Sequence, residues 1–175
     1  MVATACPSTE KRGESEMTTL PWINAGMAYE GTREVKGSQH NPVIVNWLVK
    51  LGAWWTDDET PWCGVFAAAV FREVGIQPPS GWYRAKSWLQ WGKPLSAPVI
   101  GCVVVFSRPG GYHVGIVIGQ DRTGNLLVLG GNQGDSVKVS AFRRDRVEGY
   151  RWPAAYPVAC ALPVLSSAEF SQSEA

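Results

Sequence analysis

The hydrophobic pattern of the chain changes its period near residue 100, and this change limits the fold more than any other feature. Before this point, apolar segments with a proline near the start and a glycine at the end are typical of helices. Three such segments cover residues 20–31, 41–52 and 60–75, and a shorter fourth covers residues 83–92. After this point, short β-branched runs alternate with Gly, Pro, Asn and Asp turns, which indicates strands. The predicted strands cover residues 101–107, 112–119, 125–131, 136–142 and 147–153.

Helices followed by consecutive short strands predict an α+β fold, in which the helices pack on one face of an antiparallel meander. At 175 residues the chain is long enough for one domain with a substantial core, and a second domain is not expected. We expect this domain to span residues 20–160. The polar residues 1–19 resemble a disordered leader, and residues 161–175 resemble a flexible tail.

The charge and the apolar runs of the chain exclude two classes of partner. A formal net charge of +1 gives no field that would attract nucleic acid. No apolar run approaches the roughly 18 residues of a membrane span. The first twenty residues also lack the apolar core of a Sec signal, so we expect synthesis in the cytoplasm without Sec export.

The spacing of the cysteines argues against a metal site. The four cysteines form no CxxC pair; they are Cys6, Cys63, Cys102 and Cys160. This spacing fits neither a zinc framework nor a dense disulfide scaffold, and a zinc site built from cysteines and His113 would have the wrong ligand spacing. No metal and no cofactor is therefore expected. Cys102, in a continuous apolar run, is most simply a core thiol.

Cys63 stands at the start of an apolar helix, in the stretch DDETPWCGVF. With Thr60 as N-cap and Pro61 as the first helical residue, Cys63 falls in the first turn, where backbone N–H groups and the helix dipole favour an anion. This placement predicts a lowered thiol pKa and a nucleophile. The alternative is a buried structural thiol. The acidic residues 57–59 are interpreted as a solvated loop, with a place on a substrate rim as the alternative.

A thiol nucleophile needs a base, and the chain offers two histidines. His40 lies in a polar loop and is expected to be solvated. His113 lies near the start of a predicted strand, on the same face as Gly115 and Gly119. Because glycines allow another backbone to approach closely, we expect the helix that carries Cys63 to dock on this face.

A third polar group is expected to orient the imidazole, as in Cys-His-Asn arrangements. The turn LGGNQGD offers Asn132 and Gln133 about one hairpin return after His113. Asn132 is the preferred candidate, and Asp135 is a lesser one. The alternative for Asn132 is an ordinary role in the turn.

The nine tryptophans are a high count for this length. Most are expected to pack in the core. Trp62 and Trp82, together with Gln133, are candidates for contact with a substrate in a groove.

Ordered blocks along the chain resemble a known family. The blocks NPVIVNWL, DDETPWCGVF, AKSWLQWG, GCVVVF, HVGIVIG, LGGNQGDSVKV and GYRWP lie within residues 21–153. They are similar to the CHAP and NlpC/P60 cysteine amidohydrolases of phage lysins and of bacterial cell-wall hydrolases and toxins. The resemblance implies a papain-like core with Cys63 as nucleophile, His113 as general base and Asn132 as orienting group. PWCG departs from the common DCSG form, so the backbone N–H of Cys63 is the expected oxyanion donor and a second donor is unassigned.

The resemblance also implies a reaction and a setting. Relatives cleave an amide bond of peptidoglycan, either the muramoyl-alanine bond or a bond within the stem peptide. We expect a monomer that acts on the cell wall after delivery or lysis, as a phage lysin or as an antibacterial toxin with a cognate immunity protein. Two alternatives stay open. The same dyad could act on a protein amide, as a protease, deamidase or acyl transferase, or the chain could be a catalytically inactive wall-binding module.

Overall fold

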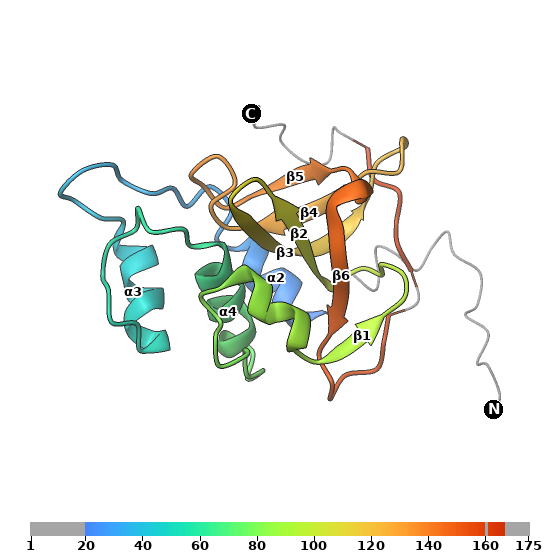
Figure 1. Cartoon of the computed structure of the whole chain (residues 1–175), viewed down its shortest axis with the longest axis horizontal. Helices are drawn as coiled ribbons and strands as arrows, with labels where there is room; N and C mark the ends of the chain where they lie inside the picture. Colours follow the sequence, from blue (N-terminus) through green and yellow to red (C-terminus); the bar gives the residue numbers. More distant parts are fainter. Residues whose placement is uncertain (1–19, 160, 167–175) are drawn as a thin grey trace.

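A helix that is apolar on every side needs cover on every side, and helix α4 (Cys63–Glu73) meets this condition. Its first nine residues are all buried. Helices α2 (Pro21–Met27) and α3 (Pro42–Leu51) pack against it, as does strand β3 (Gly111–Gln120). Figure 1 shows α4 between α3 and the sheet. It is therefore the central helix of the computed structural model, which describes residues 20–159 and 161–166.

Six antiparallel strands form one sheet in the order β1-β6-β2-β3-β4-β5. Besides β3, the strands are β1 (Lys93–Leu95), β2 (Val103–Arg108), β4 (Leu126–Gly130), β5 (Lys138–Phe142) and β6 (Val147–Trp152). Strands β2 to β5 form the predicted meander. The last predicted strand is present as β6, but the prediction that it extends the meander is wrong. After the 3-10 turn η2 (Arg144–Arg146) the chain crosses back, and β6 pairs with β2 and β1.

The segment predicted as a fourth helix forms the short 3-10 helix η1 (Ala85–Gln90) and continues into the edge strand β1. Gly92, between them, has a φ of 58°, and a Cβ there would overlap the carbonyl oxygen of Trp152. This connection therefore requires glycine. Strand β1 was not predicted because it is short and contains Pro94, which sheets tolerate mainly at an edge.

The boundaries of α3 follow the sequence signals. Asn41 is the N-cap, and its side chain accepts a hydrogen bond from the N–H of Val43 at 2.8 Å. Gly52 ends the helix in the left-handed conformation, with a φ of 74°. Both caps are the predicted ones, and this part of the prediction is confirmed.

Helix α4 begins at Cys63 rather than at Pro61. Trp62, not Thr60, is the N-cap. The chain before it forms a local turn, in which the N–H of Thr60 donates to Oδ1 of Asp57 at 2.7 Å. Cys63 nonetheless lies in the first helical turn, where backbone N–H groups have no partner within the helix.

The C-terminal segment remains packed beyond the predicted boundary. Ala161 and Leu165 are buried. The N–H of Gln120, at the end of β3, donates to the carbonyl of Pro163, and the N–H of Leu165 donates back to the carbonyl of Gln120. Residues 161–166, which fall within the predicted tail, are thus packed against the end of β3.

Two expectations concern residues that the structure does not describe. The predicted leader, residues 1–19, and the rest of the predicted tail, residues 167–175, lie outside the described residues, as does residue 160. Within the described part of the chain, no helix combines the length and apolar character needed to cross a membrane.

Candidate active site

The thiol of Cys63 lies between the first turn of α4 and strand β3. Only 5% of the residue is exposed, and this burial raises the pKa of the thiol above its ordinary value. The polar backbone at Val114, Gly64 and Cys63 itself and the charge of Arg108 oppose this rise. Burial outweighs them. The lowered pKa predicted from the helix position is therefore wrong, because the loss of water is a larger effect than the favourable helix terminus.

His113 lies on β3, one residue before Val114, and pairs across the sheet with Phe106 of β2. Its imidazole ring stacks on Phe142, with 5.4 Å between the ring centroids. Only 8% of the residue is exposed. Burial lowers the pKa of His113 to about 4, against the opposing effect of a hydrogen bond to Gln133. The imidazole is therefore neutral at neutral pH.

The partner of this imidazole is Gln133, whose Oε1 lies 2.9 Å from Nε2 of His113. The orientation of the Gln133 amide is fixed, because its Nε2 donates to the carbonyl oxygens of Val128 and Lys138 at 3.1 and 2.6 Å. Its oxygen must then accept from the imidazole, so the proton of the neutral ring is on Nε2. Nδ1 of His113 is left as the nitrogen that can accept a proton.

Asn132 precedes Gln133 but its side chain points elsewhere. Its φ of 57° is left-handed, which changes the direction of the chain between the two amide side chains. Nδ2 of Asn132 donates to Oε2 of Glu34 at 3.2 Å, and the same oxygen accepts from Nε1 of Trp62 at 3.1 Å. The hydrogen bond that the sequence prediction gives to Asn132 is thus made by Gln133. Asp135, the lesser candidate, forms a surface ion pair with Lys36 at 3.6 Å.

Two glycines let the turn after β4 approach the candidate site. A Cβ on Gly130 would overlap the side-chain oxygen of Gln133 and lie 3.3 Å from Nε2 of His113. A Cβ on Gly131 would lie 2.7 Å from the ring of Trp62, next to Cys63. This turn therefore passes directly against the first turn of α4, as only glycine permits.

The glycines predicted to receive the helix have other neighbours. A Cβ on Gly115 would overlap Val128 of β4, and one on Gly119 would lie 2.6 Å from the side chain of Leu165. The space beside these two glycines is thus filled by the next strand and by the C-terminal segment, while α4 packs against β3.

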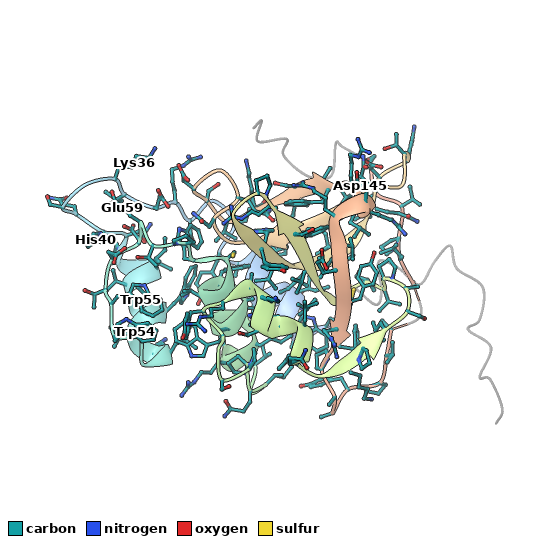
Figure 2. The ribbon with its side chains drawn as sticks, viewed as in Figure 1. Lys36, His40, Trp54, Trp55, Glu59 and Asp145 are labelled. Carbon is teal, nitrogen blue, oxygen red and sulfur yellow. The ribbon has the colours of Figure 1, made fainter. Side chains whose placement is uncertain are left out.

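His40 belongs to a separate polar cluster at one end of the molecule (Figure 2). Its Nδ1 lies 2.9 Å from Oδ1 of Asp58, whose side chain is fully buried. Oδ2 of Asp58 accepts from the N–H groups of Val35 and Asn41, both at 2.8 Å. Burial alone would raise the pKa of Asp58, but these hydrogen bonds outweigh it and hold the pKa below its ordinary value. The interpretation of the acidic run as a solvated loop is therefore wrong for Asp58, which anchors the loop before α3.

The predicted substrate contacts differ in their exposure. Trp62 is only 1% exposed and Gln133 is buried, so neither side chain presents a surface to a substrate. Trp82 is partly exposed. Cys102 is fully buried, and this burial raises its pKa to about 12, so the prediction of a core thiol is confirmed. In residues 20–159 and 161–166, no three His, Cys, Asp or Glu side chains gather as a metal site would need.

One known family model matches the region of the chain that contains this site. The CHAP domain model matches residues 55–132, a span that includes Cys63 and His113 and ends one residue before Gln133. This match covers slightly less than half of the chain. A match to this family indicates peptidoglycan hydrolase or amidase activity in general, since CHAP domains are typically cysteine/histidine amidases or peptidases. The predicted α+β class with a papain-like CHAP fold is confirmed.

Comparison of whole structures adds one similar chain, a hypothetical invasion protein of Mycobacterium tuberculosis. The two share 19% sequence identity with a TM-score of 0.47, over 85% of this chain and 66% of the other. The chain thus spans slightly less than two thirds of that structure. No curated protein matches the sequence.

Proposed function

We propose that this CHAP domain is a cell-wall hydrolase that cleaves an amide bond of peptidoglycan through an acyl-enzyme on Cys63. The observation that carries the proposal is the hydrogen bond between Nε2 of His113 and Oε1 of Gln133 at 2.9 Å. It leaves Nδ1 of His113 as a free base, one residue from the backbone N–H that meets the Cys63 sulfur. A thiol, a base and a group that orients the base are the parts that nucleophilic catalysis by cysteine needs.

In the proposed reaction, the thiol proton of Cys63 moves to Nδ1 of His113 as the sulfur attacks the carbonyl carbon. Both groups are neutral at rest, because burial raises the pKa of Cys63 and lowers that of His113 to about 4. Proton transfer and attack are therefore expected to be coupled, with His113 acting as a general base. The carbonyl oxygen becomes negatively charged in the tetrahedral intermediate, and the backbone N–H of Cys63 is the proposed donor to it.

The second half of the proposed reaction restores the enzyme. The imidazolium of His113 gives its proton to the amine nitrogen, the carbon–nitrogen bond breaks, and a thioester on Cys63 remains. Water then loses a proton to His113 and attacks the thioester carbon. The acid product leaves, and the proton held by His113 returns to the Cys63 sulfur.

Gln133 takes the orienting role in this proposal, in place of Asn132. Its fixed amide holds His113 in one tautomer and one ring position. A neutral amide also leaves the imidazole uncharged until it accepts the thiol proton of Cys63, whereas a carboxylate would favour the charged ring.

The charge around the site supports a peptide with free carboxylates as substrate. Arg108, at the end of β2, and Arg146, in η2, each lower the pKa of His113 through their positive charge, after the larger effect of burial. Both are exposed, and neither pairs with a carboxylate in the described part of the chain. Unpaired guanidinium groups near a thiol favour an anionic peptide over a neutral one.

The experiment that tests this function incubates purified peptidoglycan with the wild type and with Cys63→Ala and His113→Ala. We expect the wild type to reduce turbidity and release soluble fragments, and both variants to release none. Cys102→Ala is the matched control, since it removes a buried thiol that has no part in the proposed reaction. This variant should retain activity. Release of fragments by Cys63→Ala would show that the nucleophile is another group. Mass spectrometry of the new termini would tell an amidase from an endopeptidase.

The setting of the enzyme is also part of the proposal: synthesis in the cytoplasm, then action on the wall after delivery or lysis, as a phage lysin or an antibacterial effector with a cognate immunity protein. Fusion to an export signal in a bacterial host tests this. The wild-type fusion should lyse the cells and the Cys63→Ala fusion should not. Growth unaffected by the exported wild type would count against a wall-degrading role.

A further inference from the structure

Four aromatic side chains form a cluster at the surface, which we name the aromatic platform: Trp54, Trp55, Trp82 and Tyr83. They come from two segments, one after α3 and one before η1. Trp54 meets Trp55 edge-on at 4.6 Å and Tyr83 edge-on at 5.0 Å between ring centroids. Trp55 stacks on Trp82 at 5.8 Å, with 25° between the rings. The rings therefore hold one another in fixed orientations.

The aromatic platform is unusual in its exposure. Trp54 is 76% exposed, and the other three members are partly exposed. The remaining six tryptophans are all buried: Trp22, Trp47, Trp62, Trp88, Trp91 and Trp152. Folding thus uses the other tryptophans as core residues and leaves this group in contact with water, which is typical of a binding surface rather than of packing. Figure 2 shows Trp54 and Trp55 beside α3.

The aromatic platform touches the helix that carries the nucleophile. A Cβ on Gly64 would overlap the carbonyl oxygen of Trp82 and lie 2.9 Å from the carbonyl of Tyr83. The backbone of the platform therefore contacts α4 one residue after Cys63.

Two cations lie on the segment that follows the aromatic platform. The guanidinium of Arg84 lies 5.1 Å above the Tyr83 ring, and Nζ of Lys86 lies 5.2 Å from the centroid of the Tyr112 ring. Tyr112 directly precedes His113 on β3. The platform and the segment that follows it therefore contact both α4 and β3, the two elements that carry Cys63 and His113.

We propose that the aromatic platform binds the glycan strand of peptidoglycan, with the Trp54 ring stacked on a pyranose. The choice of polymer rests on the function proposed above. The apolar C–H face of a sugar ring complements the electron-rich face of an indole, and the sugar hydroxyls can pair with the cations at the rim.

This position has a consequence for the bond that is cut. The backbone of the platform contacts α4 next to Cys63, so a glycan bound to the platform places the bond between the muramoyl sugar and the peptide on the side of the thiol. A bond further along the stem peptide would lie further from the platform. The inference therefore selects the muramoyl-alanine bond, and the released fragments should be glycan chains without peptide.

The test uses the full chain with Cys63→Ala, which prevents cleavage, and chitohexaose, an N-acetylglucosamine hexamer without a peptide. Binding is measured by calorimetry and by tryptophan fluorescence. We expect Trp54→Ala in this background to weaken binding by about tenfold, the loss of one stacked aromatic contact. Trp54→Phe, which keeps a ring, should recover most of the affinity. Val164→Ala is the matched control, since Val164 is a 59% exposed apolar residue of the C-terminal segment, and it should bind like the parent.

Several outcomes separate this inference from the proposed function. No binding of chitohexaose by the parent, or equal binding by parent and Trp54→Ala, overturns the inference. A parent that is dimeric in analytical ultracentrifugation and becomes monomeric with Trp54→Ala, without binding chitohexaose, also overturns it. If the wild type releases no fragments from peptidoglycan while chitohexaose still binds through Trp54, the hydrolase proposal fails and the glycan site stands. Thermal unfolding of each variant checks that the mostly exposed Trp54 can be removed without unfolding.

Discussion

The two histidines of this chain differ in the charge of their hydrogen-bond partners: one partner is a neutral amide and the other is a carboxylate. His113 is buried against a neutral amide, that of Gln133, and its pKa is lowered to about 4. His40 is partly exposed and meets the buried carboxylate of Asp58. A carboxylate favours the charged form of an imidazole, whereas an amide that accepts from the ring fixes its tautomer without adding a charge. The buried carboxylate of Asp58 thus anchors a loop and does not contact the candidate base. His113 stays neutral and can accept a proton.

Among the variants considered for the two histidines, removal of the Gln133 amide beside His113 should have the largest effect on activity. We expect Gln133→Ala to lower kcat on peptidoglycan by about 10³-fold, because the imidazole loses both its tautomer and its orientation. Asn132→Gly is the matched control, since it removes the neighbouring amide and suits the φ of 57°. It should cost about tenfold or less. A larger loss for Asn132→Gly than for Gln133→Ala would return the orienting role to Asn132.

The lowered pKa of His113 should appear as a loss of stability in mild acid. The unfolded chain takes up a proton on this residue near pH 6.5, but the folded chain only near pH 4. The unfolded state therefore binds more protons between these values, and stability falls as the pH drops through this window. The expected loss is about 3 kcal/mol. Urea unfolding at pH 7, 5.5 and 4 measures it.

Two variants distinguish the histidines in that experiment. His113→Asn should lack most of the loss between pH 6.5 and 4, because the group that titrates is gone. His40→Asn should retain it. An unchanged acid profile in His113→Asn would mean that His113 is protonated at its ordinary pKa in the folded protein.

Local signals in the sequence predicted much of this fold. The caps of α3 depend on Asn41 and Gly52 alone, and both were correct. The meander from β2 to β5 follows from short runs and turns between neighbours in the chain. The position of β6 could not be predicted in the same way, because its pairing with β2 joins strands that are separated by three others along the chain.

The candidate site was predicted in part, for a similar reason. Cys63 and His113 are marked by residue type and local pattern. The choice between Asn132 and Gln133 depends on a left-handed backbone at Asn132, which the sequence GGNQGD does not specify. The pKa of Cys63 depends on burial by β3 and by the 82–83 segment, which are distant in sequence. Tertiary contacts therefore decided both questions.

Asp58, which contacts His40, should affect stability rather than catalysis. We expect Asp58→Asn to lower the free energy of unfolding by about 2 kcal/mol, because the amide cannot accept all three hydrogen bonds that the carboxylate receives. Asp145→Asn makes the same chemical change in an exposed ion pair with Arg143, on the far side of the molecule (Figure 2), and should cost less than about 0.5 kcal/mol. Urea unfolding at pH 7 gives both values. Equal losses would show that Asp58 is no anchor.

The smallest expected effect concerns Glu34, which lies between the loop near His40 and the turn near His113. The loop that Asp58 anchors begins with Glu34, which accepts from Trp62, next to Cys63, and from Asn132, next to Gln133. Glu34→Ala should loosen both neighbours and lower kcat/KM by about tenfold, while Glu34→Gln, which keeps an acceptor oxygen, should lose less. Glu59→Ala removes another carboxylate that holds this loop, at the N–H of Gly37, and should leave kcat/KM close to that of the wild type. A loss in Glu59→Ala as large as in Glu34→Ala would mean that the loop acts as a whole, and that the two histidine regions are not independent.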